Sequence, residues 1–562
     1  MSSRLLKEVL TYSPKALKFG TSGVRAKVEE LTDLEVYCLT RGTLAYLERI
    51  GKLVLRPRAR ETIAIPLAGD LRPSTPRLLK ATARAILDAG FQVDYVGFLP
   101  TPALTYYALE RGVASFMVTG SHIPADRNGQ KANRCDGEVL KGDEAGIIAL
   151  VEQLRAQEYS LPLEESKFLP DGSLKPEHVP ELPKINAACA KVYRDRYREG
   201  FGPQALKGLK VLFFEHSAVG RELVPQILAD AGAEVISVGR CEEFIPLDTE
   251  AISEAQLELL GGWVKKKQPI DAVVTTDGDS DRPLLMGVKA GELRVFPGDL
   301  LGATVAEFLK ADAAAVPISA NPTLEDWLAA RGISLRRTRI GSPYVIEAMA
   351  SLKASGKRVV AWEANGGFLL GSSLALGEKV LKALPTRDAV LPILGALSFA
   401  KQRQRDLASL MERFPKSFGW SDLIEDFPRE DGQRLVAYFA PQDLSVEEVS
   451  FARGEIVLLG EGGRELFRLP EADPQAELWL ERKKRLEEVF SARLGFSPLV
   501  GINVLDGVRC RFADGEVAHF RPSGNAPQLR IYAYAATLAR AREIAKLAVA
   551  KGGLLELLAH KL

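Results

Sequence analysis

Short apolar runs alternate with amphipathic helical patterns along most of the chain, and this alternation restricts the fold more than any other feature. The first round reads as strand, helix and strand over residues 62–70, 75–90 and 91–99. A helix that connects two neighbouring strands crosses back over the sheet and leaves those strands parallel. The pattern therefore predicts α/β units with largely parallel sheets.

The same order returns twice. A second round covers residues 209–220, 221–232 and 233–239, followed by a helical pattern at 253–267 and a buried strand at 271–279. A third covers residues 314–320, 324–332 and 334–341, followed by a helix at 343–356 and a strand at 358–367. We interpret these rounds as three similar α/β units in succession.

The pattern changes after about residue 401, which indicates a separate α+β domain. A charged helix at 476–495 is followed by alternating strands at 507–524 and 528–535 and by an Ala-rich helix. The predicted fold class is thus α/β, with three related α/β domains and a C-terminal α+β domain. The predicted domains are residues 1–165, 185–297, 298–405 and 410–562.

Composition and charge exclude several classes of protein. The 562 residues are enough for three to five domains at ~100–200 residues each. Lys plus Arg (74) nearly balance Asp plus Glu (73), so no global field favours nucleic acid or an anionic membrane. The five cysteines lack metal-ligand or disulfide-framework spacing, and no signal peptide or ~18-residue apolar run is present. We expect a cytoplasmic protein with no nucleic-acid or membrane partner.

The stretch "MVTGSHIPADRNGQK", residues 117–131, raises the question of a reactive serine. Ser121 follows a strand-like apolar run, and either it is a nucleophile on an exposed turn or it caps a backbone amide. A nucleophilic serine needs an activating base, and His122 is adjacent in sequence without being bound to point the same way. The residues of this stretch alone leave both interpretations open.

A second stretch, "TTDGDSDRP", places carboxylates at alternate positions directly after an apolar strand. Asp277, Asp279 and Asp281 would project together if the backbone wraps round a cation, with Gly278 allowing a tight path. Hard carboxylate oxygens suit Mg²⁺ or Ca²⁺ better than a soft metal. The loop is not a full EF-hand, because no Glu stands at its twelfth position. An Asp-rich surface turn is the alternative.

Three further loops offer polar groups for a sugar or a phosphate. "KFGTSGVRA" (18–26) contains Arg25, and "WEANGGFLLGSS" (362–373) offers Glu363 and Asn365 beside two glycines. In "RPSGNAPQLRIY" (521–532), guanidinium, hydroxyl and backbone donors could cradle a phosphate. The candidates there are Arg521, Ser523, Gly524, Asn525 and Arg530. Each stretch by itself is equally explained as a turn.

Taken in this order, the five loops resemble those of the α-D-phosphohexomutase superfamily, the phosphomannomutase/phosphoglucomutase enzymes. The similarity spans nearly the whole chain. It implies four domains round a central cleft and a serine that rests phosphorylated. Phospho-Ser121 would give its phosphoryl group to a hexose monophosphate, and the resulting hexose 1,6-bisphosphate would return its other phosphate to Ser121.

The resemblance also implies a role for each site residue. One Mg²⁺ per chain would be held by the phosphoserine at Ser121 and by the three aspartates. Lys131 matches a lysine that assists as general acid or base, Arg25 an arginine near the phosphoserine, and Arg282 adjoins the metal site. Glu363 and Asn365 would bind sugar hydroxyls. The non-reacting phosphate would be gripped by Arg521, Ser523, Gly524, Asn525 and Arg530.

The chain departs from the family pattern at several positions. Gly120 stands where alanine is usual, Ile123 where asparagine is, and Gly367 where histidine is. Asn365 replaces a serine, Asn525 and Ala526 alter the phosphate loop, and residues 430–495 appear as extra sequence. The preferred sugar, mannose or glucose, is left open, as is a monomer or a small homo-oligomer. Alternatives are a phosphoglucosamine mutase, a non-catalytic sugar-phosphate-binding relative and an aspartyl phosphatase.

Overall fold

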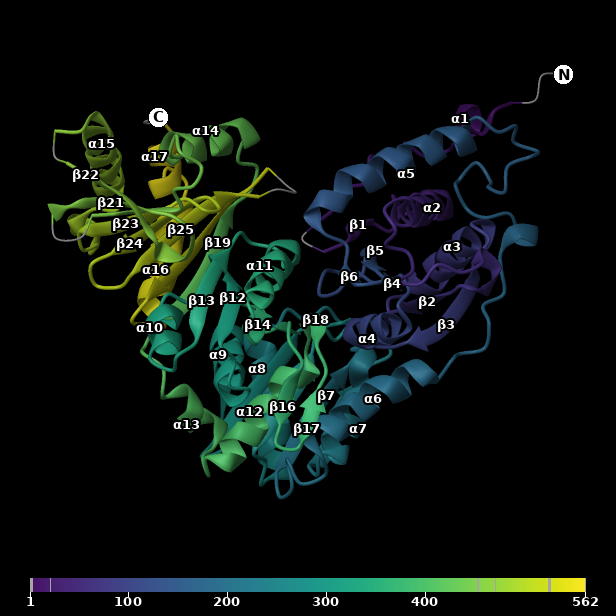
Figure 1. The fold of residues 1–562 in the computed structure, drawn as a ribbon, viewed down its shortest axis with the longest axis horizontal. Coiled ribbons are helices and arrows are strands. Elements are labelled where there is room, and N and C mark those ends of the chain that lie inside the picture. The colour runs from purple at the N-terminus through teal and green to yellow at the C-terminus, as the bar shows by residue number, and fades with distance from the viewer. Residues whose placement is uncertain (1–3, 21, 452–453, 471, 524–526, 561–562) are drawn as a thin grey trace. The chain divides into compact units, whose positions relative to one another are not determined.

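The computed structural model describes residues 4–20, 22–451, 454–470, 472–523 and 527–560. They form two compact units, the first from residues 1–311 and 341–411, the second from residues 312–340 and 412–562. Figure 1 labels many of the helices and strands of both units. The predicted α/β class is confirmed, because each predicted round of strand and helix is present.

The N-terminal part of the first unit is built on a six-stranded sheet. Its strands lie in the order β1, β5, β4, β2 and β3, with β6 paired to β5. β2 is parallel to β3 and β4, whereas β5 is antiparallel to β1 and β4. The strands are β1 (Val24–Lys27), β2 (Ala64–Gly69), β3 (Gln92–Phe98), β4 (Ser115–Val118), β5 (Arg127–Arg134) and β6 (Gly137–Glu138).

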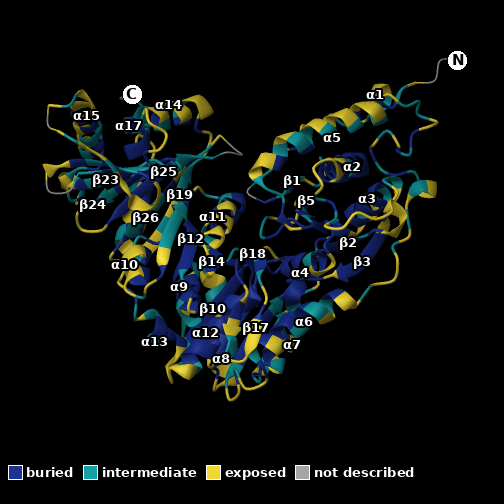
Figure 2. Cartoon of the chain, in the orientation of Figure 1, coloured by how far each residue is buried: buried dark blue, intermediate teal, exposed yellow. Residues whose placement is uncertain are grey.

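Helices cover this sheet and supply much of its apolar core. α2 packs against α3 and α5, and the buried leucines and valines of these helices join those of the strands in one cluster. Figure 2 shows the outward face of α5 exposed. The helices are α1 (Leu6–Val9), α2 (Asp33–Arg49), α3 (Thr75–Asp88), α4 (Thr101–Arg111) and α5 (Glu144–Tyr159).

Strand β5 differs from the sequence prediction, in which residues 119–131 belonged to one loop. The strand is polar yet largely buried, because hydroxyl groups from neighbouring elements satisfy its side chains. The Gln130 amide nitrogen lies 2.9 Å from the hydroxyls of both Thr40 and Thr82. Asn133 bonds two further hydroxyls in the same way. The turn proper is therefore shorter than predicted, and Lys131 lies on a strand opposite Met117.

A five-stranded sheet forms the middle of the first unit, in the order β11, β10, β9, β7 and β8. β7 is parallel to β8 and β9, and β9, β10 and β11 form an antiparallel meander. The strands are β7 (Lys210–His216), β8 (Glu234–Arg240), β9 (Ala272–Thr276), β10 (Pro283–Lys289) and β11 (Glu292–Phe296). The helices of this region are α6 (Ala188–Phe201), α7 (Leu223–Asp230) and α8 (Glu254–Lys267).

The rest of the first unit continues to residue 411. Strand β15 is antiparallel to β14 and to β18, and β16 and β17 form a separate hairpin. Helix α12 packs on α9 and is buried from residue 390 to 400, as its dark blue colour in Figure 2 shows. These elements are α9 (Gly298–Phe308), α11 (Ser342–Ala354), β14 (Val359–Trp362), β15 (Phe368–Leu370), β16 (Leu374–Leu376), β17 (Lys379–Leu381), β18 (Leu384–Asp388), α12 (Val390–Gln402) and α13 (Leu407–Met411).

The second unit contains the parallel pair β12 and β13 and an eight-stranded sheet. The order of that sheet is β19, β26, β25, β24, β23, β20, β21 and β22. Strands β20, β21 and β22 come from the extra sequence at 430–495 and extend the sheet beyond β23. The strands are β12 (Ala313–Pro317), β13 (Ser334–Thr338), β19 (Phe418–Ile424), β20 (Glu448–Ser450), β21 (Ile456–Leu459), β22 (Glu465–Leu469), β23 (Leu499–Asn503), β24 (Val508–Phe512), β25 (Val517–Pro522) and β26 (Leu529–Ala535).

Helices complete the second unit. Its buried residues, among them Phe439, Leu486 and Phe520, form a core of their own. The helices are α10 (Leu324–Ala329), α14 (Arg429–Phe439), α15 (Pro474–Val489), α16 (Leu538–Val549) and α17 (Leu554–His560). Across the described parts of the chain, no helix has both the length and the apolar character that crossing a membrane requires.

Candidate active site

Ser121 lies in the turn between β4 and β5 and has an unusual backbone conformation. Its φ is 58°, a left-handed value that a residue other than glycine seldom adopts, and its side chain is fully buried. Such a conformation costs about 1–3 kcal/mol and persists only where the surroundings enforce it. The Ser121 Oγ donates a hydrogen bond of 2.8 Å to Asp277 Oδ2. The serine hydroxyl therefore faces the predicted metal loop and does not cap a backbone amide.

The predicted metal loop is the turn of the β9–β10 hairpin, residues 277–282. The amide of Asp277 donates to the carbonyl of Arg282 at 3.1 Å. The Asp277 Oδ1 accepts from the amides of Asp281 at 3.2 Å and Arg282 at 3.1 Å. Residue 280, a serine, has a φ of 56°. The carboxylate of Asp277 thus shapes the turn that presents the other two aspartates.

Gly278 has a role in packing, and no positive φ requires it. A Cβ at this position would lie 2.6 Å from the carbonyl oxygen of Ser121. Contacts under 3.0 Å do not occur for a real Cβ, so any larger residue would push the two turns apart. The close approach of the turns, and not a tight backbone path, explains this glycine.

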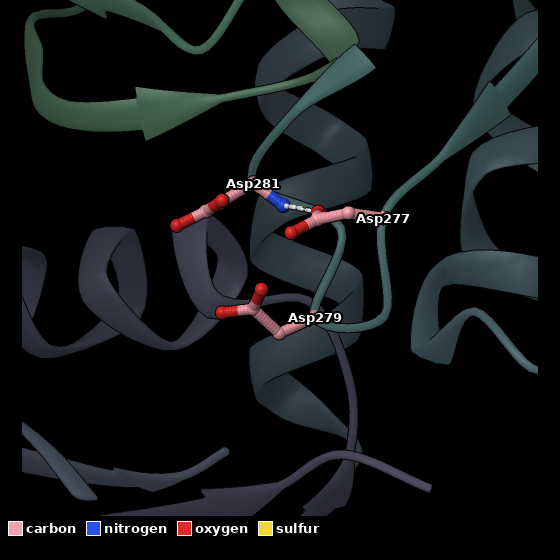
Figure 3. Close-up of side chains that lie close together, drawn as sticks. All are labelled: Asp277, Asp279 and Asp281. Carbon is pink, nitrogen blue, oxygen red and sulfur yellow. Dashed lines mark hydrogen bonds between the residues drawn. The ribbon is translucent and has the colours of Figure 1, made fainter. Parts of the chain in front are cut away.

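The three aspartates form a cluster that fits a divalent cation. One carboxylate oxygen from each of Asp277, Asp279 and Asp281 lies within 4.8 Å of the others (Figure 3). The Lys131 ammonium, on β5, donates to the Oδ2 atoms of Asp279 at 2.6 Å and Asp281 at 2.7 Å. The Oδ1 atoms of these two residues are buried and have no hydrogen-bond donor within the described chain. Buried carboxylate oxygens without a donor are suited to Mg²⁺.

The pKa values of Asp277 and Asp279 are shifted in opposite directions by burial and by neighbouring charges. Burial, followed by the charges of Asp279 and Asp281, raises the pKa of Asp277 well above its usual value. Burial acts to raise the pKa of Asp279, but the Lys131 ammonium, the Thr101 hydroxyl and the charge of Arg387 together leave that pKa lowered. A cation bound among these oxygens would relieve the repulsion that acts on Asp277.

Arg25 and Arg282 place buried positive charge near the aspartate cluster. The Nε and Nη2 atoms of Arg25 and the Nε of Arg282 have no hydrogen-bond partner among the described residues, although both side chains are buried at these atoms. Burial, then the charge of Arg282, lowers the pKa of Arg25 to about 10. Two neighbouring guanidinium groups with free donors make a site for an anion such as a phosphoryl group.

His122 is neutral in this structure. Its Nδ1 lies 3.4 Å from the Ser121 Oγ. Burial, followed by the charges of Arg282 and Arg25, lowers the pKa of His122 to about 2. The adjacent histidine therefore carries no charge at neutral pH.

The predicted sugar loop is linked to the metal turn by a residue that the sequence analysis missed. Arg387, at the end of β18, donates from Nη1 to Glu363 Oε2 at 2.9 Å and from Nε to Asp281 Oδ2 at 3.1 Å. The side-chain oxygen of Asn365 accepts from the amide of Gly367 at 2.9 Å. Arg387 and Asp388 are charged residues at the end of β18, directly before the apolar helix α12. This charged pair is the sequence signal that could have identified Arg387.

Thr101 is a second residue that the sequence analysis missed. It begins helix α4, and its hydroxyl donates to Asp279 Oδ2 at 2.5 Å while its amide donates to the carbonyl of the same residue at 3.0 Å. Nothing in the sequence round Thr101 indicates this contact.

The predicted phosphate loop belongs to the second unit. Arg521 on β25 forms an ion pair of 3.1 Å with Asp506, and Arg530 on β26 is exposed. The amide of Ser523 donates to the carbonyl of Gln528 at 2.8 Å. Gly524, Asn525 and Ala526 lie outside the described residues, as does Thr21 of the N-terminal loop.

The first unit thus brings together all of the predicted catalytic and metal-binding residues. The two turns, strand β5 and the N-terminal loop contribute Ser121, His122, Lys131, Arg25, Asp277, Asp279, Asp281 and Arg282. Glu363 joins them through Arg387. Buried acid, base and phosphate-binding groups at one place are the mark of a catalytic site.

Comparisons with known proteins place the chain in a family. Residues 16–158 match the family model "Phosphoglucomutase/phosphomannomutase, alpha/beta/alpha domain I", and residues 297–418 match domain III of the same family. A phosphomannomutase of Sinorhizobium fredii is 38% identical over 519 residues, which is 92% of this chain and 94% of the relative. A phosphomannomutase of Salmonella muenchen is 34% identical over 521 residues, 92% of each chain.

Solved structures share the fold. A phosphoglucomutase/phosphomannomutase family protein from Burkholderia thailandensis has a TM-score of 0.62 at 17% identity and covers 95% of this chain and 98% of its own. An N-acetylphosphoglucosamine mutase of Aspergillus fumigatus, in complex with GlcNAc-6P and magnesium, has a TM-score of 0.52 at 13% identity and covers 99% of this chain and 97% of its own. The two phosphomannomutases at 38% and 34% identity confirm the family predicted from the five loops: the chain belongs to the phosphoglucomutase/phosphomannomutase family.

Proposed function

We propose that the chain is a Mg²⁺-dependent phosphohexomutase that interconverts the 1-phosphate and 6-phosphate of mannose, glucose or both. The observation that carries this proposal is the position of Ser121. Its buried hydroxyl lies 2.8 Å from Asp277, beside the aspartate cluster and the free donors of Arg25 and Arg282. A phosphoryl group on Ser121 would meet a cation and two guanidinium groups.

The reaction consists of two transfers, each of a different phosphoryl group. In the first, the bond between phosphorus and the Ser121 Oγ breaks and a bond to a free hexose hydroxyl forms, while the proton of that hydroxyl leaves it. The bisphosphate then turns end for end, and its other phosphoryl group passes back to Ser121. Asp277, Asp279, Asp281 and the phosphoserine would hold Mg²⁺, which would supply positive charge to neutralise the phosphoryl group.

The residues of the first unit then have defined tasks. Arg25 and Arg282 hold phosphoryl oxygens, because the buried Nε and Nη2 of Arg25 and the buried Nε of Arg282 have no hydrogen-bond acceptor among the described residues. Lys131 acts as general acid and base next to Asp279 and Asp281. His122 contributes a neutral ring beside the Ser121 Oγ and carries no proton between substrates.

Substrate recognition is divided between two groups of residues. Glu363 and Asn365 bind sugar hydroxyls, and Asn365 does so through its amide nitrogen because its oxygen accepts from Gly367. The non-reacting phosphate is held by Arg521, Ser523, Gly524, Asn525 and Arg530. We assign these groups to four domains, residues 1–165, 185–297, 298–405 and 410–562. The active enzyme is a monomer or a small homo-oligomer. It acts in the cytoplasm. Hexose 1,6-bisphosphate serves as intermediate and activator.

The alternatives have less support. Phosphoglucosamine mutases match at lower identity, 26% over 477 residues for that of Maricaulis maris. A non-catalytic sugar-phosphate-binding role would not explain a buried serine held in a left-handed conformation against three aspartates.

The test combines phosphate analysis with an assay of three substrates. Intact-protein mass and peptide mapping should find one phosphate on Ser121, and mannose 1-phosphate or glucose 1-phosphate should isomerise with catalytic bisphosphate, faster than glucosamine 1-phosphate. Ser121→Ala should abolish turnover, whereas Ser160→Ala, at the end of α5, should not change it. Full activity of Ser121→Ala, or no interconversion of any hexose phosphate, would overturn the proposal.

A further inference from the structure

Arg72 lies outside all five loops, in the connection between β2 and α3, yet it contacts the Ser121 turn more extensively than any other side chain described. Its side chain is buried, with 1% of the residue exposed. The Nη2 donates to the carbonyls of Ser121, at 2.9 Å, and Ile123. The Nη1 donates to the carbonyls of Pro124 at 2.6 Å and Arg127 at 2.9 Å.

The guanidinium has no unused donor. A guanidinium carries five N–H groups in a planar fork, and the fifth, on Nε, lies 3.2 Å from Asp70 Oδ2. Four of the five acceptors are main-chain carbonyls of the one turn. Because these bonds reach the main chain, Arg72 constrains the course of the backbone whatever side chains the turn carries.

Asp70 holds the other end of the same turn. Its Oδ2 accepts from the Thr119 hydroxyl at 2.7 Å and from the Gly120 amide at 3.3 Å. The amide of Ser121 in turn donates to the Thr119 hydroxyl at 2.8 Å. The residues before Ser121 are therefore fixed through Asp70 and those after it through Arg72.

Two contacts fix the guanidinium itself. Its central carbon lies 4.1 Å from the centroid of the Phe244 ring, in cation–π geometry. A Cβ at Gly120 would lie 2.6 Å from the same carbon. The guanidinium is thus held between a ring and the backbone of the residue that precedes Ser121.

We propose that Arg72 is a positioning residue for phosphoryl transfer, which keeps Ser121 in its left-handed conformation with its Oγ toward the metal turn. The inference rests on the proposed function of Ser121 as phosphoryl carrier. It also explains how the turn tolerates Ile123 in place of the family's asparagine, because the carbonyl of residue 123 is held and its side chain is not needed. A misplacement of about 1 Å at a reacting group can lower a rate 10²-fold.

The experiment compares Arg72→Ala and Arg72→Lys with a matched control, Arg77→Ala. Arg77 is an arginine of the same domain that pairs with Asp33 and does not contact the turn. For each purified full-length variant, kcat and KM for mannose 1-phosphate and glucose 1-phosphate, thermal unfolding, and amide hydrogen exchange of residues 119–127 are measured.

We expect kcat of Arg72→Ala to fall about 10²-fold with KM changed less than threefold, and exchange of the turn to rise. Arg72→Lys should fall nearly as far, because one ammonium cannot reach five acceptors in a plane. Arg77→Ala should keep its kcat and the exchange of the turn. A purely structural role of Arg72 would instead lower the unfolding temperature of Arg72→Ala and leave kcat of the folded enzyme unchanged.

The outcomes separate this inference from the proposed function. If Ser121→Ala is inactive while folded Arg72→Lys retains full kcat and normal exchange of the turn, the positioning role is wrong and the carrier serine stands. If Ser121→Ala is active, the proposed function fails first. If neither Arg72→Ala nor Arg72→Lys folds, kcat of Gly120→Ala is the test, because the added methyl group displaces the guanidinium of Arg72. An unchanged kcat of Gly120→Ala would then overturn the inference.

Discussion

The two turns that meet at the candidate active site are built in opposite ways. Each contains a buried serine with positive φ, Ser121 at 58° and Ser280 at 56°. The metal turn is held by its own first residue, since the carboxylate of Asp277 accepts from two amides four and five residues later. The serine turn is held from outside, by Arg72 and Asp70, about fifty residues earlier in the chain.

This difference separates what each turn can do. The internal bonds of the metal turn set its shape, and Thr101 and Lys131 hold Asp279 from outside, which together suit a fixed cation site. A turn bonded through its carbonyls to a distant arginine leaves its own side chains free for chemistry. The predictions below test this contrast, from the largest expected effect to the smallest.

Asp277→Ala should cause the largest loss, about 10³-fold or more in kcat, because it removes a ligand of the cation that would neutralise the phosphoryl group. It should also lower the free energy of unfolding by about 1–3 kcal/mol, since two amides lose their acceptor. Asp277→Asn should be as inactive but keep its stability, because an amide oxygen still accepts. Kinetics and chemical denaturation of both variants check this; equal stability of both would contradict the self-held turn.

Lys131→Met should break the direct link between β5 and the metal turn. We expect kcat to fall about 10²-fold or more with loss of the acid–base group. The half-saturating concentration of Mg²⁺ should fall as well, because the ammonium no longer competes for Asp279 and Asp281. Activity measured across a Mg²⁺ titration tests both effects, and weaker Mg²⁺ activation would show that Lys131 supports the cation site.

Gly120→Ala should perturb the serine turn from the side of Arg72. The added methyl lies within 2.6 Å of the guanidinium, and we expect kcat to fall about tenfold as the turn shifts by a fraction of an ångström. Gly142→Ala, where a Cβ meets no atom within 4 Å, is the matched control. Steady-state kinetics of the two variants suffice, and equal rates would contradict close packing at Gly120.

The pH dependence should carry no contribution from His122. Its pKa is lowered to about 2 by burial and the nearby arginines. For a base with a lowered folded pKa, protonation costs stability only as pH falls below its unfolded value of about 6.5. Well above pH 6.5 the ring is neutral in both states and adds no pH dependence to stability. His122→Asn should therefore leave the apparent pKa values of the kcat/KM profile between pH 6 and 9 unchanged; a shifted acidic limb would refute a neutral His122.

Ile123→Asn should have the smallest effect, less than threefold in kcat. It restores the family's usual residue at a position whose carbonyl, not its side chain, is bonded to Arg72. A large gain in kcat would show that the missing amide matters and that Arg72 does not compensate for it. The same assay and a melting curve are sufficient.

Much of the fold and part of the site followed from the sequence. The strands and helices of the three rounds were predicted because their periodicity is local and strong. The aspartate turn was predicted because its ligands and its shaping bonds lie within six residues. The extent of the serine loop was wrong, because β5 is a polar strand whose side chains are satisfied by hydroxyl groups from other elements.

The sequence by itself determined the alternation of strands and helices, the aspartate turn and the order of loops that is typical of the family, because each depends on residues close together in the sequence. Only the tertiary structure decided that Lys131, 148 residues from Asp279, bonds to it, and that Arg387, 106 residues from Asp281, joins the sugar loop to the metal turn. The same is true of Arg72. These contacts depend on how strands and helices pack, and hydrogen bonds between distant segments leave no periodic trace in a single sequence.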